Sequence, residues 1–128
     1  MLKFLFLLAG LAIFAGAKVE IISVAPDEVS KYPQIVDVRT PEEWKQTGVI
    51  KGAITVDMRG NRKKILQKLI KDLDLSKPVA FVCRLGTRSP FLARSLDDEI
   101  RGLKIVVFKD GMTKLINDGY KTVPYETK

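Results

Sequence analysis

Five short apolar runs, separated by segments of helical pattern, constrain most strongly what this chain can fold into. Several of the runs are continuous and rich in valine and isoleucine, as expected of strands that are covered on both faces. They end at turns or at polar segments, which sets their length at a few residues each. The predicted strands are residues 19–23, 35–38, 53–56, 78–82 and 105–108.

The segments between these runs have the periodicity of amphipathic helices. In one of them Ile65, Leu69 and Leu73 fall on a single helical face. Strands and helices that alternate in this order predict one compact α/β domain with a mainly parallel sheet. Ligands of such sheets bind beyond the carboxyl ends of the strands. The predicted helices are residues 26–31, 41–46, 62–73, 90–100 and 112–117.

Composition limits the chemistry that is available. The chain has 128 residues, of which 46% are apolar and 29% charged, enough for one domain with a core. It has no histidine and a single cysteine, Cys83. Ser-His-Asp and Cys-His catalysis, histidine-bound metals, an intrachain disulfide and a multi-cysteine zinc site are therefore excluded. Any catalysis has to use one thiol, carboxylates, or cationic and backbone groups.

The first 17 residues have the pattern of an export signal. Lys3 precedes an apolar run, and Ala15, Gly16 and Ala17 have the small side chains that signal peptidase accepts. A helix over residues 4–17 would be about 21 Å long, which is short of the hydrocarbon core of about 30 Å. We expect a signal peptide over residues 1–17 and an exported domain over 18–128, periplasmic or secreted, without a stable membrane span. A retained anchor is the alternative.

The strongest candidate for a site follows the fourth predicted strand, where the chain reads VCRLGTRSP. The strand ends on Cys83, a loop with Gly86 and two arginines follows, and a helix opens with Ser89 as its expected N-cap. A thiolate that faces a helix N-terminus meets free N–H groups and the positive end of the helix dipole. Gly86 allows successive amides to point into one anion-binding concavity, and Arg84 and Arg88 add positive potential. We therefore expect Cys83 to be a reactive nucleophile, not an inert core residue.

The spacing in this loop separates two chemistries. Loops of the tyrosine-phosphatase type have five residues between the nucleophilic cysteine and the arginine, and commonly a histidine before the cysteine. Here four residues separate Cys83 from Arg88, and Val82 precedes the cysteine. The tighter ring fits a single extra sulfur better than a phosphoryl group, so both differences favour sulfur chemistry.

The chain resembles the single-domain rhodaneses, a family of sulfurtransferases. The matching motifs are IVDVRTPEEW from Ile35, GVIKGAI from Gly48 and VCRLGTRS from Val82, followed by Gly-Met at 111 and Gly-Tyr at 119. Family members often have a histidine where this chain has Val49, a difference that concerns packing more than chemistry. The resemblance implies a rhodanese-like fold with a five-stranded, mainly parallel sheet and helices on both faces.

The same resemblance implies a reaction. Cys83 would take a sulfur atom from thiosulfate, a polysulfide or a persulfide and pass it to cyanide or a thiol, with no metal or organic cofactor. The expected partners are small anionic donors, thiol or cyanide acceptors, and a protein acceptor as a further candidate. A cysteine-dependent phosphatase or arsenate reductase, or a non-enzymatic module that carries or senses sulfur, stay open as alternatives. The loop residues that would hold the persulfide are Arg84, Leu85, Gly86, Thr87 and Arg88.

Two charged residues, Asp37 and Arg39, follow the second predicted strand and are supporting candidates. One interpretation is that they steer a substrate or tune Cys83. Buried charges are normally paired, however. We therefore expect a structural role, with Asp37 binding loop amides and Arg39 pairing with Glu42 or Glu43.

The net charge of +7 includes a basic run between Arg59 and Lys71 that contains no acidic residue. A run of this kind is usually the solvated face of an amphipathic helix. It lacks the aromatic residues of a groove for single-stranded nucleic acid. We therefore expect no nucleic-acid partner.

Overall fold

Five parallel strands lie at the centre of the computed structural model, which describes residues 19–127. Their order across the sheet is β1-β5-β4-β2-β3, and every pairing is parallel. The predicted signal peptide lies outside the described residues and stays a prediction. The strands are β1 (Val19–Ile22), β2 (Ile35–Asp37), β3 (Ile54–Thr55), β4 (Val79–Val82) and β5 (Ile105–Phe108).

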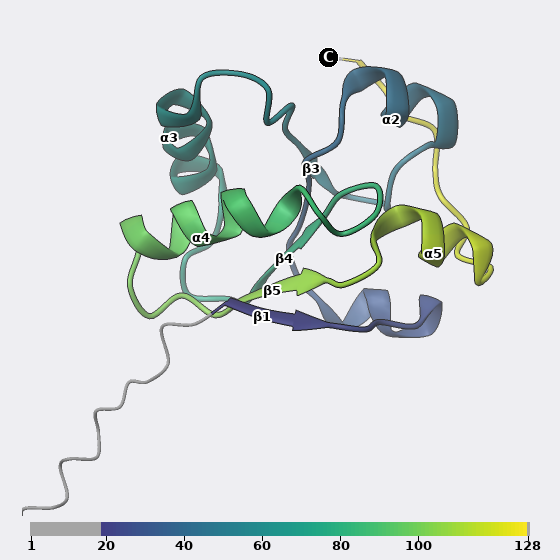
Figure 1. The fold of residues 1–128 in the computed structure, drawn as a ribbon, viewed down its shortest axis with the longest axis horizontal. Coiled ribbons are helices and arrows are strands. Elements are labelled where there is room, and N and C mark those ends of the chain that lie inside the picture. Colours follow the sequence, from purple (N-terminus) through teal and green to yellow (C-terminus); the bar gives the residue numbers. More distant parts are fainter. Residues whose placement is uncertain (1–18, 128) are drawn as a thin grey trace, which may run out of the picture.

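Helices cover both faces of this sheet (Figure 1). α3 and α4 pack on one face, while η2 and α5 pack on the other. The predicted fold class, a five-stranded parallel α/β sheet with helices on both sides, is confirmed. The helices are η2 (Pro26–Lys31), α2 (Pro41–Thr47), α3 (Arg62–Asp72), α4 (Ser89–Glu99) and α5 (Gly111–Asn117).

The order of elements agrees with the pattern of the sequence, and no bound differs by more than one residue. The first helix differs in type, because η2 is a 3-10 helix of six residues. Short helical segments of this kind commonly adopt the tighter 3-10 geometry. The basic residues from Arg62 to Lys71 lie on the exposed side of α3, while Ile65 and Leu69 on its other side are buried.

The position of β4 decides where the site can form. All four residues of β4 are fully buried, because the strand lies between β5 and β2 and under helices on both faces. Phe81 faces the layer of α3 and α4, and Val82 faces the layer of η2 and α5. The carboxyl end of β4, and the loop that follows it, are therefore held from several directions.

The C-terminal segment packs against the region of α2. Val49 and Val123 form an antiparallel bridge, and the Trp44 and Tyr125 rings lie 5.1 Å apart. Thr122 adds a hydrogen bond of 2.7 Å from its hydroxyl to the carbonyl of Thr47. Within residues 19–127, no helix is both long enough and apolar enough to cross a membrane.

Replacing Leu69 with alanine tests this core. Leu69 is fully buried between α3 and the sheet, so Leu69→Ala should lower the free energy of unfolding by about 2–5 kcal/mol. Leu75→Ala is the matched control, because Leu75 is 36% exposed and should cost much less. Urea unfolding of the three proteins measures the difference. Equal losses in the two variants would contradict the packing described here.

Candidate active site

The two segments that the sequence singles out lie side by side at the carboxyl edge of the sheet. β2 and β4 are parallel neighbours, with Asp37 paired in register with Val82. One residue further on, the amide of Val38 donates to the carbonyl of Val82 at 2.9 Å. Cys83 therefore begins its loop directly beside the turn that leads from β2 to α2. This is the end of a parallel sheet at which ligands bind.

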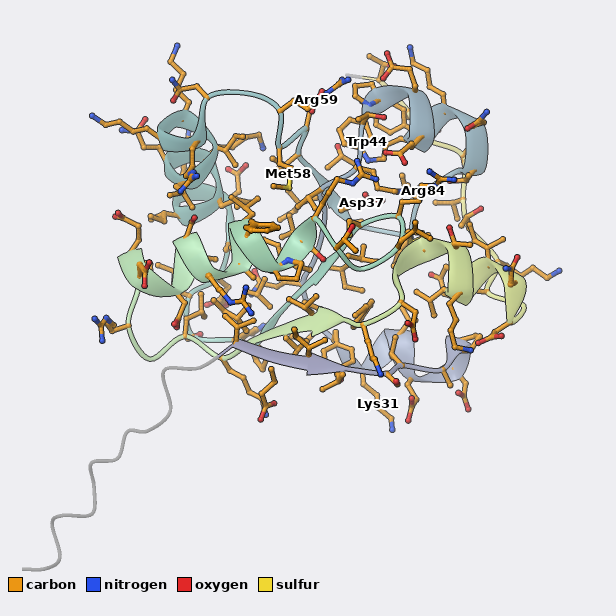
Figure 2. All side chains as sticks on the ribbon, in the orientation of Figure 1. Lys31, Asp37, Trp44, Met58, Arg59 and Arg84 are labelled. Carbon is orange, nitrogen blue, oxygen red and sulfur yellow. The ribbon has the colours of Figure 1, made fainter. Side chains whose placement is uncertain are left out.

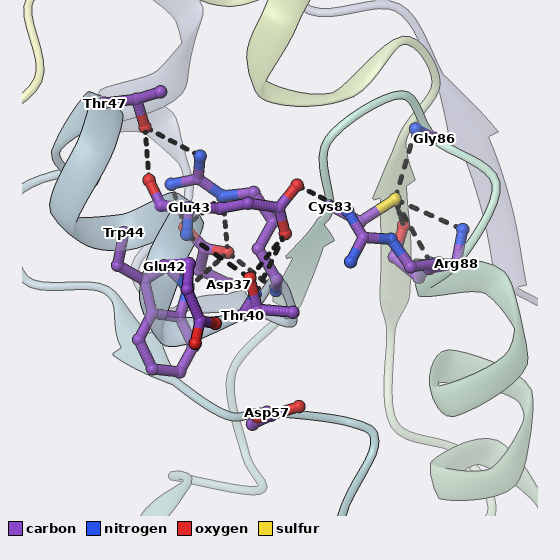
Figure 3. A network of polar contacts seen from close by, with 12 residues as sticks. Asp37, Thr40, Glu42, Glu43, Trp44, Thr47, Asp57, Cys83, Gly86 and Arg88 are labelled. Carbon is purple, nitrogen blue, oxygen red and sulfur yellow. Dashed lines mark hydrogen bonds and ion pairs between the residues drawn. The ribbon is translucent and has the colours of Figure 1, made fainter.

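Four hydrogen-bond donors converge on the sulfur of Cys83. The amide nitrogens of Gly86, Arg88 and Ser89 lie 3.1, 3.3 and 3.4 Å from Sγ, and the Ser89 hydroxyl donates to the same atom at 3.4 Å. Figure 3 shows Gly86 and Arg88 on either side of this sulfur. A thiol is a weak acceptor, whereas an anion in a ring of N–H groups is strongly favoured. The arrangement therefore suits a negative charge on sulfur, although the thiol itself is fully buried.

The curl of this loop depends on Gly86. Its φ angle is +91°, in the region that favours glycine. A Cβ atom at this position would collide with the backbone carbonyl of Lys109, just beyond β5. The loop thus reaches its closed shape only with glycine here, as the sequence pattern indicates.

The first turn of α5 holds the same loop from the opposite side. The amides of Met112 and Thr113 donate to the carbonyls of Cys83 and Arg84, at 2.8 and 3.1 Å. Gly111 makes this close approach possible, since a Cβ there would collide with the same carbonyl groups. These two hydrogen bonds fix the start of the loop against α5.

The expected N-cap role of Ser89 is wrong. Arg88 occupies the cap position without a side-chain cap bond, and Ser89 is the first residue of α4. Its hydroxyl instead turns inward, where it is fully buried against the sulfur of Cys83. Sequence reasoning missed this contact, because it depends on how the loop closes around the sulfur.

The two arginines of the loop are not equivalent. Arg88 is bound by Glu43, with Nη2 3.0 Å from Oε2. Arg84 is exposed, and its side chain has no hydrogen-bond or ion-pair partner among residues 19–127. Figure 2 shows Arg84 between α2 and α5. Arg84 is therefore the free cation at the rim of the loop.

The pair formed by Glu43 and Arg88 changes the acidity of both groups. Burial raises the pKa of Glu43, but hydrogen bonds from Arg88 and Thr40 outweigh this effect, so the pKa lies below its ordinary value. The hydrogen bond to Glu43 raises the pKa of Arg88. Glu43 also completes the capping box of α2 with Thr40. One carboxylate thus joins the start of α2 to the cysteine loop.

Asp37 and Arg39 form a buried ion pair with each other. Arg39 Nε lies 3.0 Å from Oδ1 of Asp37, and Nη2 lies 2.8 Å from Oδ2. The expected pairing of Arg39 with Glu42 or Glu43 is therefore wrong. Asp37 is only two residues away and shares the buried side of the turn, whereas Glu43 turns outward to Arg88.

The remaining contacts of this pair connect it to α2, not to the sulfur. The indole N–H of Trp44 donates to Asp37 at 3.1 Å. Arg39 donates to the hydroxyl of Thr47 and to the carbonyl of Gly48, at 2.8 and 2.9 Å. Nearly all the donors and acceptors of the pair are thus used locally. Asp37 and Arg39 brace the β2–α2 turn beside the cysteine loop and do not contact Cys83.

An open hollow of about 410 Å³ adjoins the cysteine loop. The side chains at its rim include Leu85 and Thr87 of the predicted loop, and Leu85 is 53% exposed. Arg84, Arg88, Glu43 and Thr40 complete the lining. Among the described residues, no three His, Cys, Asp or Glu side chains are grouped to hold a metal ion.

The Glu43–Arg88 pair generates a prediction for the dependence of stability on pH. The pKa of Glu43 is lowered on folding, so its ionised carboxylate stabilises the folded protein. This contribution to the free energy of unfolding is complete above the pKa of the unfolded chain, about 4.5, and is lost as pH falls through the folded pKa. Glu43→Gln should lower the free energy of unfolding near neutral pH, by less than about 1 kcal/mol for this partly exposed pair. The difference from the wild type should disappear in acid.

Urea unfolding at about pH 7 and about pH 3 measures this effect. Glu99→Gln, at the exposed end of α4, is the control and should show a smaller change between the two conditions. A deficit of Glu43→Gln that is the same at both pH values would contradict the role given to the ion pair.

Comparison with known proteins places this geometry in a family. Residues 25–118 match the family described as "Rhodanese-like domain". None of the curated proteins matches the sequence. A rhodanese-related protein from Thermoplasma volcanium is 27% identical with a TM-score of 0.62, over 79% of this chain and 96% of that one.

Two further solved structures are similar. A rhodanese-like domain protein from Staphylococcus aureus is 27% identical with a TM-score of 0.58, over 79% of this chain and 97% of that one. A probable thiosulfate sulfurtransferase is 25% identical with a TM-score of 0.60, over 80% of this chain but 47% of that one. The family match spans η2 through α5 and includes the whole cysteine loop. The chain therefore belongs to the rhodanese-like domain family.

Proposed function

We propose that the protein is a sulfurtransferase that carries a sulfane sulfur as a persulfide of Cys83. The observation that carries this proposal is the convergence of three amides and one hydroxyl on the Cys83 sulfur. Such fixed dipoles stabilise a thiolate without a neighbouring base. Family membership, and the name of the similar thiosulfate sulfurtransferase, support the same reaction class.

The first half of the reaction loads the cysteine. An anionic donor such as thiosulfate is attracted to the hollow by Arg84, the free cation of the loop. The thiolate of Cys83 attacks the outer sulfur of the donor and forms a new S–S bond. The S–S bond of thiosulfate breaks, and sulfite leaves with the bonding electron pair.

The second half returns the cysteine to its starting state. A nucleophile, cyanide or a thiolate, attacks the outer sulfur of the persulfide. The persulfide bond breaks, and its electron pair returns to Sγ of Cys83 as the thiolate. Between the two halves, the loop amides hold the charge on sulfur, in the manner of an oxyanion hole. Neither step requires a metal or an organic cofactor.

Export is part of the proposal. With residues 1–17 as a signal peptide, the domain would work in the periplasm or outside the cell. Such compartments are oxidising, and a single reactive thiol there is exposed to polysulfides and other carriers of sulfane sulfur. The donors would therefore be small anions that reach the site from solution.

Intact-mass measurement after thiosulfate treatment tests the proposal. The wild type should gain one sulfur atom and lose it again on addition of cyanide, with thiocyanate as the product. Cys83→Ser should gain none, since Cys83 is the only cysteine of the chain.

Two other results would point elsewhere. No gain with thiosulfate or polysulfide, together with hydrolysis of an aryl phosphate, would replace sulfur transfer by phosphatase chemistry. Loading without release to cyanide or to any thiol would show a carrier module, not a transferase.

A further inference from the structure

A pocket of about 210 Å³ lies between α3 and α4. It shares no lining residue with the hollow beside Cys83, so it is separate from the proposed site of sulfur transfer. Figure 2 shows Met58, which follows β3, above the first turns of α4. The pocket, called here the α3–α4 pocket, is lined by four apolar side chains, Met58, Ile65, Phe91 and Leu92, and by Arg62 and Ser95.

The apolar walls of this pocket are only partly covered by the protein itself. Ile65 and Leu92 are buried, whereas Phe91 beside them is 66% exposed. A phenylalanine exposed to this extent next to a recess is unusual on a folded domain unless something binds there. An apolar group in the pocket would cover the ring of Phe91 and displace water from these walls, which is favourable.

The polar side of the pocket carries a cation that has no counter-ion within the protein. Arg62 of α3 donates from Nη1 to the hydroxyl of Ser95 on α4 at 3.3 Å. This is its single side-chain hydrogen bond among residues 19–127, where it also binds no carboxylate. The guanidinium has five N–H donors in a planar fork that matches a carboxylate. Most of these donors are therefore available to an anion.

The charge and the size of the pocket limit what can occupy it. No acidic residue lines it, and the nearby Arg59 is neutralised by Asp57. One unpaired cation therefore fits a ligand with one negative charge. The volume is that of about seven water molecules, at roughly 30 Å³ each, and is below the 300–1,000 Å³ or so of pockets for drug-sized ligands. A short chain or a single ring would fill it.

We propose that the α3–α4 pocket binds a small organic carboxylate, with one negative charge on an apolar ring or short chain. The carboxylate binds the guanidinium of Arg62, and the apolar part lies against Phe91 and Met58. This site goes beyond the proposed sulfur transfer and does not depend on it, since the two share no residue.

Equilibrium binding of phenylacetate and of its uncharged amide, phenylacetamide, tests the role of charge. NMR titration of the wild type should give about tenfold tighter binding of the acid, because a hydrogen bond to a charged group contributes at least that factor. Arg62→Gln should abolish this preference. Lys63→Gln is the matched control, since it removes the same charge from the next residue, which is exposed and does not line the pocket.

A further variant tests the apolar part of the site. Phe91→Ala removes an exposed ring and should leave the fold intact. It should weaken both phenylacetate and phenylacetamide by about two- to tenfold, the contribution of one aromatic contact, with the ratio between them unchanged. Leu75→Ala, at an exposed apolar residue outside the pocket, should leave both affinities as they are.

Arg84→Gln establishes where the acid binds. Arg84 lines the hollow beside the cysteine loop and not the α3–α4 pocket, so this variant should keep the affinity of the wild type for phenylacetate. If Arg84→Gln removes binding, the acid occupies the hollow and the inference is wrong. It is equally wrong if the acid and the amide bind alike, if neither binds in the millimolar range, or if Arg62→Gln and Lys63→Gln lose the same affinity. None of these results bears on the loading of Cys83 with sulfur.

Discussion

The closed loop between β4 and α4 is the constraint on which the rest of the site depends. The amides of Gly86, Arg88 and Ser89 face the sulfur of Cys83, and the first turn of α5 holds the start of the loop through the carbonyls of Cys83 and Arg84. Gly86 lets the loop pass close to the end of β5, and the buried strand β4 holds its starting point. The parallel sheet brings these elements to one edge. The ring of amides around the sulfur is therefore a direct result of the topology.

Charge around the loop is divided between fixed and free groups. Asp37 and Arg39 are buried and bind each other, and Trp44 donates to Asp37 while its ring contacts Tyr125 of the C-terminal segment. Glu43 holds Arg88 at the entrance of the loop. Of the two arginines in the loop, Arg84 is the one whose side chain has no partner among residues 19–127. It is therefore the one available to an anion at this edge of the sheet.

Much of the fold and the core of the site could be predicted from the sequence, because both depend on local pattern. Continuous Val- and Ile-rich runs identify buried strands, and a cysteine at the end of one such run, followed by Gly86, identifies the loop. The choice of ion-pair partners could not be predicted, since side-chain direction decides it. Arg39 had Glu42, Glu43 and Asp37 within reach along the chain, and only the buried turn selects Asp37.

Features that depend on tertiary contact were also beyond sequence reasoning. Serine is a common N-cap residue, which is why the sequence predicts that role for Ser89. Only the closure of the loop turns its hydroxyl toward the sulfur. The α3–α4 pocket joins two helices that are separated by β4 along the chain, which no local pattern reports. The predicted signal peptide over residues 1–17 is a pattern of a different kind, because it predicts targeting and not fold, and it stays a prediction.

The most direct test of the account is a crystal structure of the protein after treatment with thiosulfate. The account predicts one additional sulfur atom on Cys83, within hydrogen-bonding distance of the amides that now face Sγ. An unmodified thiol, or a sulfur adduct that points away from these amides, would contradict it.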